Sequence, residues 1–318
     1  RCLLSTAHFP PPPFLPLSRL CCTGLSPCPA FPNLAPSEAL PCSSLHAQPA
    51  RLKSAVLNVQ RGPDLGRPRL PLQRTRVLVT GSSTGIGEQM AYEFARMGAH
   101  VMVTARREEQ LQQVVQNLRG HFHCAGMQPA VPFALPGGLD MLVLNHVGGN
   151  AGFQPFKGDM ELVISSMTVN FLSYVQLTIS AMDLLREAHG NIVVVSSMSG
   201  RIPAPFSTAY AAAKFALEGF YSSLRTELRL RGVDLPVTVA VLGYIDTDTA
   251  LKIVGGKINM QASPKEDCAR EIVRGGALRK REVFYPYWST KPALLLRDWL
   301  PELMEQLIGQ AYLLEKIL

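Results

Sequence analysis

Long apolar runs and clustered metal ligands are both absent from this 318-residue sequence. A transmembrane helix needs about 20 mostly apolar residues, and no such run is found, so none is predicted. Cys124 and Cys268 stand alone, without cysteines or histidines at metal-binding spacing, so no metal site is predicted. The segment Leu15–Leu25 is interrupted by Pro, Ser and Arg, which excludes it as the apolar centre of a secretory signal.

A strong charge is also missing from most of the chain. The formal net charge is +7, but residues 1–75 hold eight Lys or Arg against two acidic residues and so account for +6. Residues 76–318 are therefore nearly neutral, and they show no stripe of Lys and Arg of the kind that follows a nucleic-acid backbone. Nucleic acid is not a predicted partner.

The first 75 residues have a composition of their own, with 14 of the 25 prolines and 5 of the 7 cysteines. Because proline fixes φ and removes a backbone donor, we predict a disordered tail over 1–75. Without a secretory signal the cysteines of this tail are interpreted as free thiols, with disulfides as the alternative. The first methionine is Met90, which leads us to expect a fragment, a processed form or an extension introduced by gene prediction.

From residue 76 onward, short apolar runs alternate with longer segments of helical period. This alternation predicts an α/β fold, a Rossmann-type doubly wound parallel sheet that forms one domain over 76–290. The predicted strands are Val77–Thr80, His100–Thr104, Met141–Asn145, Asn191–Ser196, Val237–Leu242 and Val283–Tyr285. The predicted helices are Ile86–Met97, Glu108–Leu118, Asp159–Glu187, Thr208–Arg229 and Pro264–Leu278.

A glycine-rich turn joins the first of these strands to the first helix. Its glycines allow a tight turn and a close approach of the backbone to a pyrophosphate, and the helix N-terminus offers free N–H groups to the phosphates. The predicted cofactor-binding residues of this turn are Gly81, Ser82, Ser83, Thr84, Gly85, Ile86 and Gly87.

The residues after the second strand indicate which dinucleotide is bound. A carboxylate there would pair with the ribose hydroxyl of NAD, whereas this chain has Arg106 and Arg107. Guanidinium groups suit a phosphate dianion, so NADP(H) is the predicted cofactor. The alternative is that the two arginines only solvate the start of a helix, which is the easier reading for Arg107.

Tyr210 and Lys214 are the predicted catalytic pair. They lie four residues apart on one predicted helix and therefore on one face, where the ammonium can stabilise a phenolate. This pair alone is common on helices, but Ser197 follows a predicted strand thirteen residues upstream and can orient a carbonyl group. Asn170 is the fourth predicted catalytic residue, either as the holder of a proton-relay water or as an amide satisfied at a helix kink.

Together these residues resemble the short-chain dehydrogenase/reductase superfamily, and more narrowly its 11β-hydroxysteroid dehydrogenase type 1 and type 1-like branch. The stretches that carry the narrower resemblance are Gly138–Met141, Leu144–His146, Val169–Tyr174, Lys214–Leu217, Ile245–Ala250 and Arg297–Pro301. The resemblance implies hydride transfer between NADP(H) and a secondary alcohol or ketone, on a steroid or another lipid, with residues around Ile202–Phe206 as pocket or core. It also implies a homodimer in the endoplasmic reticulum or secretory pathway.

The resemblance assigns roles to individual residues as well. Tyr210 is the acid/base, Ser197 orients the substrate and Lys214 binds the nicotinamide ribose. Further cofactor contacts implied by the resemblance are Asn145, His146 and Val147, and then Ile245, Asp246, Thr247, Asp248 and Thr249.

One segment departs from the family pattern. Between the second helix and Leu139 the family has a third strand and a full helix, whereas this chain has a shorter stretch with three prolines. We predict a short edge strand at His121–Cys124, followed by a loop or one helical turn, which would uncover an apolar face of the sheet. The intact catalytic residues favour an active enzyme, and this short segment favours a non-catalytic relative that keeps the fold as a binding protein.

The C-terminal segment 291–318 is rich in leucine and amphipathic. We interpret it as a surface that contacts a membrane or a second subunit, or as a segment that packs on its own domain.

Overall fold

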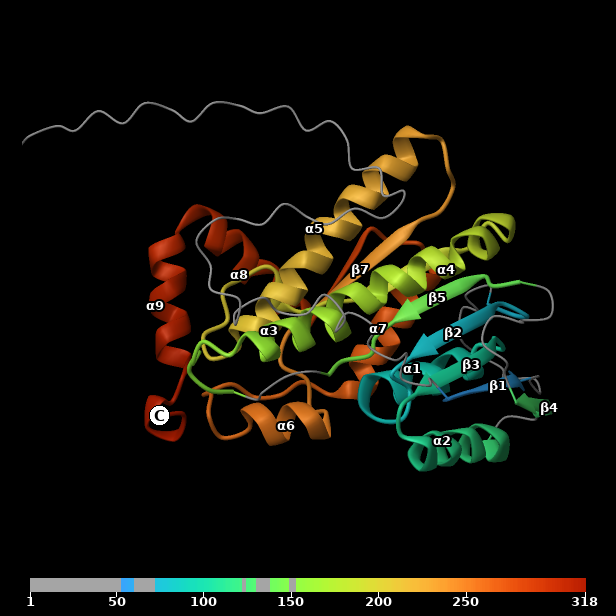
Figure 1. Cartoon of the computed structure of the whole chain (residues 1–318), viewed down its shortest axis with the longest axis horizontal. Helices are drawn as coiled ribbons and strands as arrows, with labels where there is room; N and C mark the ends of the chain where they lie inside the picture. Colours follow the sequence, from blue (N-terminus) through green and yellow to red (C-terminus); the bar gives the residue numbers. More distant parts are fainter. Residues whose placement is uncertain (1–52, 60–71, 122–123, 130–137, 149–152) are drawn as a thin grey trace, which may run out of the picture. The chain divides into compact units, whose positions relative to one another are not determined.

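The computed structural model describes residues 53–59, 72–121, 124–129, 138–148 and 153–318. One eight-stranded sheet has the order β4-β1-β3-β2-β5-β6-β7-β8 (Figure 1). Its strands are β1 (Lys53–Val59), β2 (Arg76–Thr80), β3 (His100–Ala105), β4 (Cys124–Pro129), β5 (Met141–Leu144), β6 (Asn191–Val195), β7 (Val237–Leu242) and β8 (Glu282–Tyr285).

The six strands β3, β2, β5, β6, β7 and β8 run parallel, as a doubly wound fold requires. The helices are α1 (Gly85–Arg96), α2 (Glu108–His121), α3 (Met160–Met167), α4 (Ser173–Glu187), α5 (Thr208–Leu230), α6 (Asp248–Val254), α7 (Lys265–Ala277), α8 (Tyr287–Trp299) and α9 (Pro301–Ala311). Short helical turns are η1 (Thr168–Leu172), η2 (Met198–Gly200) and η3 (Leu314–Lys316). The six predicted parallel strands and the five predicted helices between residues 76 and 285 are therefore confirmed within a few residues at their ends, with the predicted helix Asp159–Glu187 built from α3, η1 and α4.

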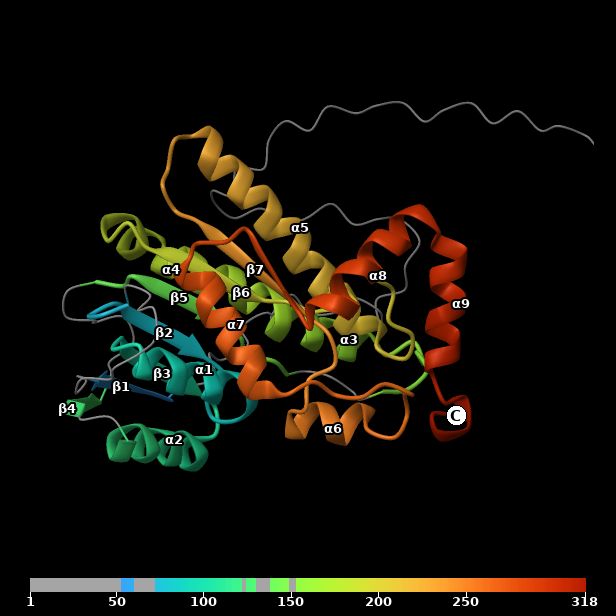
Figure 2. The same cartoon turned by 180° about the vertical axis from the view of Figure 1, so that it is seen from behind.

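Helices cover both faces of the sheet. In β5, Met141 and Val143 pack in one core cluster with α1, α2 and α7, and the alternate residues Leu142 and Leu144 pack in the other with α4, α5 and α8. Figure 1 views the face covered by α4 and α5, and Figure 2 views the face covered by α1 and α7. A strand buried on both faces needs apolar side chains at every position, which is why these strands are continuous apolar runs.

The start of the domain differs from the prediction of a tail without structure over 1–75. Lys53–Val59 forms strand β1, which pairs antiparallel with β3 and β4. This stretch is free of proline and rich in apolar residues, so it can pair along the open edge of β3. Leu72 is also buried in the core, so the folded part begins before residue 76. Residues 1–52 and 60–71 of the predicted tail lie outside the described residues.

The shortened segment is also organised differently from the prediction. His121 ends α2 instead of beginning a strand, and β4 runs over Cys124–Pro129. Between β4 and β5 no helix is present among the described residues, and 130–137 lie outside them. The apolar face expected to be uncovered is not open at Leu78 and Met102, which are 9% and 7% exposed.

The continuous helical stretch Met160–Glu187 qualifies the prediction that no segment can span a membrane. By length and composition it could cross one, with a mean hydropathy of 1.4 over its most apolar window. Its residues Tyr174, Ala181 and Leu185 are buried in the core cluster on the α5 face of the sheet. One side of the stretch therefore packs in the core of this domain, while 22% of its most apolar window is buried in all.

Candidate active site

The glycine-rich turn Thr80–Gly87, called the glycine turn below, is shaped by contacts that leave no room for side chains. Gly81 and Gly85 have φ of +66° and +65°, which L side chains rarely adopt. A Cβ on Gly81 would lie 2.6 Å from His146 Cα, and a Cβ on Gly87 would lie 2.2 Å from the Gly81 carbonyl oxygen. The turn therefore packs backbone on backbone at the carboxyl edge of the parallel sheet, where α/β proteins bind ligands.

Polar contacts hold this turn against the end of β5. Asn145 Nδ2 donates to the carbonyl oxygens of Thr80 and Gly81 at 3.1 and 3.3 Å. Thr80 Oγ1 accepts from the Asn145 backbone N–H at 2.9 Å and donates to the Val143 carbonyl oxygen at 3.2 Å. The side-chain amide of Asn145, which the resemblance predicts as a cofactor contact, thus also fixes the shape of the turn.

The two predicted phosphate-binding arginines flank the glycine turn. Arg107 Nη2 donates to Thr84 Oγ1 at 2.6 Å and to Ser83 Oγ at 3.3 Å. Arg106 lies against the loop after β5, because a Cβ on Gly148 would be 2.9 Å from its Nη2. Two guanidinium groups beside a turn rich in backbone N–H groups form a site with the donors that a phosphate needs.

The segment after β7 reaches the same turn through Thr247. A Cβ on Gly85 would lie 3.2 Å from Thr247 Cγ2, and the Thr247 hydroxyl accepts from the Ala250 N–H at 3.2 Å to cap α6. Ile245 is buried beneath, and Asp246 Oδ1 accepts from the Lys265 N–H at 2.7 Å at the start of α7. The other predicted contacts of this segment, Asp248 and Thr249, are exposed on the first turn of α6, and Val147 of the loop after β5 is 38% exposed.

The structure brings Ser197, Tyr210 and Lys214 together. Lys214 Nζ lies 5.6 Å from the Tyr210 ring centroid, and Ser197 is near enough to the Tyr210 hydroxyl to lower its pKa by hydrogen bonding. Lys214 is buried and donates to the Val195 carbonyl oxygen at 2.9 Å. Burial raises the pKa of Tyr210 to about 12, although the bond to Ser197 acts in the opposite direction. Burial lowers the pKa of Lys214 to about 7, and the charge of Glu218 opposes this shift.

Asn170 lies at a π-helical turn, η1, within the long helix that precedes β6. It is fully buried, its Nδ2 donates to the carbonyl oxygens of Gly148 and Ser166 at 2.7 and 2.9 Å, and its Oδ1 accepts from the Gly148 N–H at 3.1 Å. The amide is therefore satisfied by the loop after β5, at the kind of helix irregularity that recurs at functional sites. Its part in a proton relay stays a prediction.

His146 connects the glycine turn to α4. Its Nδ1 lies 2.9 Å from Thr80 Oγ1 and its Nε2 lies 2.6 Å from Ser173 Oγ. Burial, followed by the charges of Lys214 and Arg106, lowers the pKa of His146 to about 4, so the ring is neutral at neutral pH. The Tyr174 hydroxyl donates to the His146 carbonyl oxygen at 2.7 Å.

Thr80, Ser166 and Tyr174 contribute to this site and were not predicted as site residues. Tyr174 is fully buried, and the Lys214 ammonium lies 5.4 Å from its ring centroid. Thr80 ends a strand directly before the glycine turn, and that position is the signal that could have identified it. Ser166 and Tyr174 follow the helical spacing of any buried helix face. The sequence therefore gives no sign that they contact the site, and only the fold brings them there.

Sequence comparisons agree with this geometry. Residues 75–256 match the family described as short chain dehydrogenase. Hydroxysteroid 11-beta-dehydrogenase 1-like protein B of Xenopus laevis is 57% identical over 256 residues, covering 76% of this chain and 88% of that protein. The like-named protein of Danio rerio is 43% identical over 259 residues, with coverages of 76% and 88%.

Solved structures share the fold. A short chain dehydrogenase of Shigella flexneri, determined in complex with NADP, has a TM-score of 0.58 at 23% identity and covers 68% of this chain and 98% of its own. A short chain dehydrogenase of Salmonella enterica serovar Typhi has a TM-score of 0.59 at 25% identity, with coverages of 70% and 98%. With its parallel sheet, its glycine turn and its Ser197–Tyr210–Lys214 cluster, this chain belongs to the short chain dehydrogenase family.

Proposed function

We propose that this protein is an NADP(H)-dependent oxidoreductase that interconverts a secondary alcohol and a ketone on a hydroxysteroid or another lipid. The observation that carries the proposal is the placement of Ser197 and Tyr210 beside the buried Lys214 ammonium, which lies 5.6 Å from the Tyr210 ring centroid, at the same edge of the sheet as the glycine turn. The related proteins named as hydroxysteroid dehydrogenase-like support the substrate class.

In the proposed reduction, Tyr210 gives its hydroxyl proton to the substrate oxygen. The bound cofactor supplies the hydride that goes to the carbonyl carbon. Because burial raises the pKa of Tyr210 to about 12, the phenol is protonated at neutral pH and can donate. Ser197 holds the carbonyl oxygen near this hydroxyl, and the positive charge of Lys214 stabilises the phenolate that remains. Oxidation of an alcohol uses the same groups in reverse.

The charge around the glycine turn supports NADP(H) over NAD(H). Arg107 reaches Ser83 and Thr84 on one side, and Arg106 lies by Gly148 on the other. These guanidinium groups would hold the ribose phosphate of NADP, and the glycine turn would hold the pyrophosphate.

Three aromatic side chains support an apolar substrate. Phe153, Phe206 and Tyr312 contact one another with ring centroids 5.4 to 5.8 Å apart, although they come from three distant segments. Phe206 lies four residues before Tyr210, so this cluster is near the start of the catalytic helix. An aromatic and apolar surface there suits a steroid or a similar lipid better than a charged metabolite.

Exposed apolar side chains support a homodimer and a membrane contact. The long helix and α5 expose Ile164, Leu172, Ile179 and Phe215, which we assign to a second copy of the chain. In α8 and α9, Leu294, Met304 and Ile308 pack on the domain, whereas Trp288 and Trp299 are 86% and 83% exposed. We assign the exposed side of α8 and α9 to a membrane surface, consistent with residence in the endoplasmic reticulum or secretory pathway.

NADPH-induced thermal stabilisation of the full chain tests the proposal. We expect saturating NADPH to raise the Tm by several degrees, on the order expected for a ligand at about 100 times its Kd. Tyr210→Phe should keep most of this shift and lose ketone reduction by roughly 10²- to 10⁴-fold, because the proton donor is gone while the fold and the turn remain. Turnover is followed as NADPH absorbance with a panel of steroid ketones.

The alternative is a relative that binds without catalysis, which the shortened segment before β5 favours. A cofactor-induced shift without turnover of any ketone would support this alternative. The absence of any shift at saturating NADPH would contradict the oxidoreductase function.

A further inference from the structure

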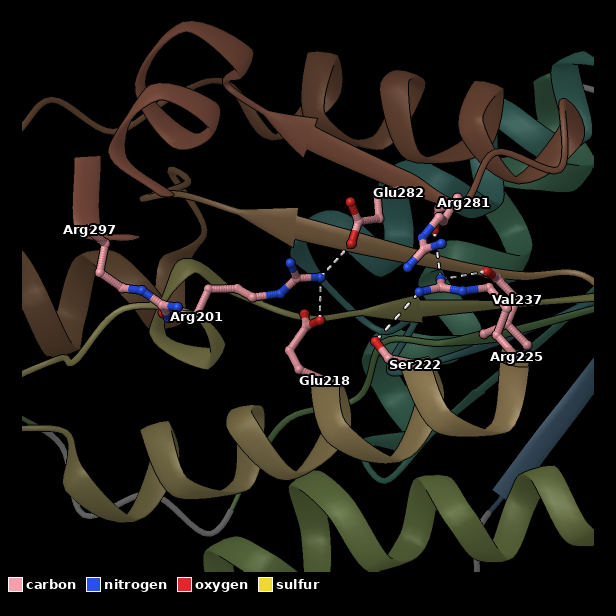
Figure 3. Close-up of polar contacts among 8 residues, drawn as sticks. All are labelled: Arg201, Glu218, Ser222, Arg225, Val237, Arg281, Glu282 and Arg297. Atoms are coloured by element: carbon pink, nitrogen blue, oxygen red, sulfur yellow. Dashed lines mark hydrogen bonds and ion pairs between the residues drawn. The ribbon is translucent and has the colours of Figure 1, made fainter. Parts of the chain in front are cut away.

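A network of partly buried charges gathers around Arg201, four residues beyond Ser197 in the chain (Figure 3). Arg201 Nη2 lies 2.6 Å from Glu218 Oε2 on α5 and 2.6 Å from Glu282 Oε1 on β8. The side chain of Glu218 is 8% exposed, and those of Glu282 and Arg201 are 21% and 25% exposed. Isolated charges are costly to bury, so three of them in contact near a reactive site require an explanation.

This network joins the two elements that carry the catalytic groups. Ser197 caps the turn η2, and Arg201 follows that turn directly. Gly200 rests on α5, because a Cβ there would lie 2.7 Å from the Lys214 carbonyl oxygen. Glu218 lies one helical turn beyond Lys214, so its pairing with Arg201 fixes the Ser197 turn to the catalytic helix at a second point.

A fourth element closes the network. Arg297 Nη1 of α8 donates to the Arg201 carbonyl oxygen. The ion pairs, together with this bond, tie η2 to α5, β8 and α8, which Figure 3 shows converging on Arg201. The position of Ser197 relative to Tyr210 thus depends on side chains that never face the substrate.

The burial of a carboxylate at Glu218 is not explained by the stability of the fold. Its carboxylate is paired with Arg201 at 2.6 Å and has no other hydrogen-bond partner among the described residues. A buried ion pair with so few other partners adds little to stability, because apolar residues of similar size could replace it at lower cost. The negative charge of Glu218 is the property that such a residue would lack.

The charged group nearest along the helix is the Lys214 ammonium. Burial lowers the pKa of Lys214 to about 7, and Glu218 raises it. The other titratable groups around Lys214 are Tyr210 on the same helix, Tyr174 on α4 and His146 from the loop after β5. Among these groups Glu218 is the carboxylate, so it is the group that favours the charged form of Lys214.

We propose that Arg201 and Glu218 are positioning residues for the reaction, which lock the Ser197 turn onto the catalytic helix and keep Lys214 charged. This inference rests on the proposed function. Glu282 and Glu218 both hold Arg201 by ion pairs. Glu218 is also the carboxylate whose charge acts on Lys214.

The charge role has a definite sign. Reduction needs the Lys214 ammonium, so activity falls as pH rises and this group loses its proton. Without the carboxylate of Glu218 the proton is lost at lower pH. Glu218→Gln should therefore move the alkaline limb of the kcat profile down by about half a pH unit or more. It should also lower kcat at neutral pH by on the order of tenfold, because Ser197 is less firmly placed.

The experiment measures kcat for ketone reduction against pH in the full chain, with NADPH and the same panel of steroid ketones. Glu218→Asp keeps the charge, so its alkaline limb should stay at the wild-type position even where kcat falls. Glu227→Gln is the matched control, because it removes an exposed ion pair with Arg231 from the same helix, and its profile should overlay the wild type. If Glu218→Gln does not fold, the double variant Arg201→Gln/Glu218→Gln removes both charges of this ion pair and leaves Glu282, whose side chain is 21% exposed, without Arg201. Its alkaline limb should be displaced in the same direction, because Glu218 is the charge that acts on Lys214.

The outcomes separate this inference from the proposed function. A wild-type protein that reduces no ketone overturns the proposed function and the inference with it. A wild-type protein that is active, with a Glu218→Gln profile that overlays it, overturns the inference alone. Equal displacement in Glu218→Gln and Glu218→Asp would also overturn the charge role.

Discussion

The glycine turn and the catalytic corner formed by Ser197, Tyr210 and Lys214 lie at the same edge of the sheet, but different contacts hold them. In the turn, Gly81 and Gly87 approach other backbone atoms so closely that a single methyl group would not fit. In the corner, Lys214 is buried with Glu218 one helical turn away, and Glu218 pairs with Arg201. The first region is specified by the absence of side chains, and the second by buried charge.

This difference predicts opposite sensitivities. The glycine turn should lose its shape on addition of one carbon atom, because its closest contacts join backbone atoms. The catalytic corner should keep its activity when a side chain is replaced by one of similar shape and equal charge. It should lose activity when a charge is removed. His146 contacts Thr80 of the turn, and the charge of Lys214 lowers its pKa. The pKa of His146 therefore depends on both regions.

The largest effect on stability is expected for Gly81→Ala. The left-handed φ costs about 1–2 kcal/mol for a residue with a Cβ, and the contact with the His146 backbone adds roughly 1–3 kcal/mol. Gly232 is the matched control, because its φ is also +66° and nothing lies within 4 Å of its added Cβ. Chemical denaturation should show about 1–2 kcal/mol lost for Gly232→Ala and clearly more for Gly81→Ala. We also expect the NADPH-induced rise in Tm to be lost in Gly81→Ala and kept in Gly232→Ala. Equal losses of stability in the two variants would contradict the steric role of the turn.

The second effect is the pH dependence of stability due to His146. Its folded pKa of about 4 lies below the ordinary value of 6.5, so between these values the unfolded state binds more protons. Stability is therefore complete above about pH 6.5 and is lost as pH falls towards 4, by about 2–3 kcal/mol. Urea denaturation from pH 7 to pH 4 should show a flatter slope for His146→Asn than for the wild type. Parallel slopes would show that the ring is not held neutral in the folded state.

The smallest effect is expected for Thr247→Ala. Thr247 caps α6 and contacts Gly85 through its methyl group, so its loss should cost about 1 kcal/mol of stability. NADPH should bind more weakly, by a few-fold, when α6 is less firmly placed beside the turn. Thr247→Ser keeps the cap and removes the methyl group, so titration of both variants separates the two contacts. An unchanged Kd in both variants would remove this segment from the cofactor site.

Much of the site could be predicted because its residues are close in sequence or sit at the ends of predicted strands. The glycine turn lies within one strand–turn–helix unit, and the Tyr210–Lys214 pair lies on one helix, so local geometry fixes each of them. Right-handed crossovers then bring the ends of parallel strands to one edge, which places Ser197 near Tyr210. The edge of the sheet could not be predicted in the same way, since Lys53–Val59 pairs with β3 only because that edge is open to it.

The sequence by itself thus determined the parallel sheet, the glycine turn and the spacing of the proposed catalytic residues, because each depends on contacts over a few residues or on right-handed crossover connections. The tertiary structure decided the rest. The pairing of Arg201 with Glu282 spans 81 residues, and the contact of Asn170 with Gly148 depends on a π turn that the helical period does not reveal. Long-range charge pairs have many possible partners in a sequence, and packing alone selects one of them.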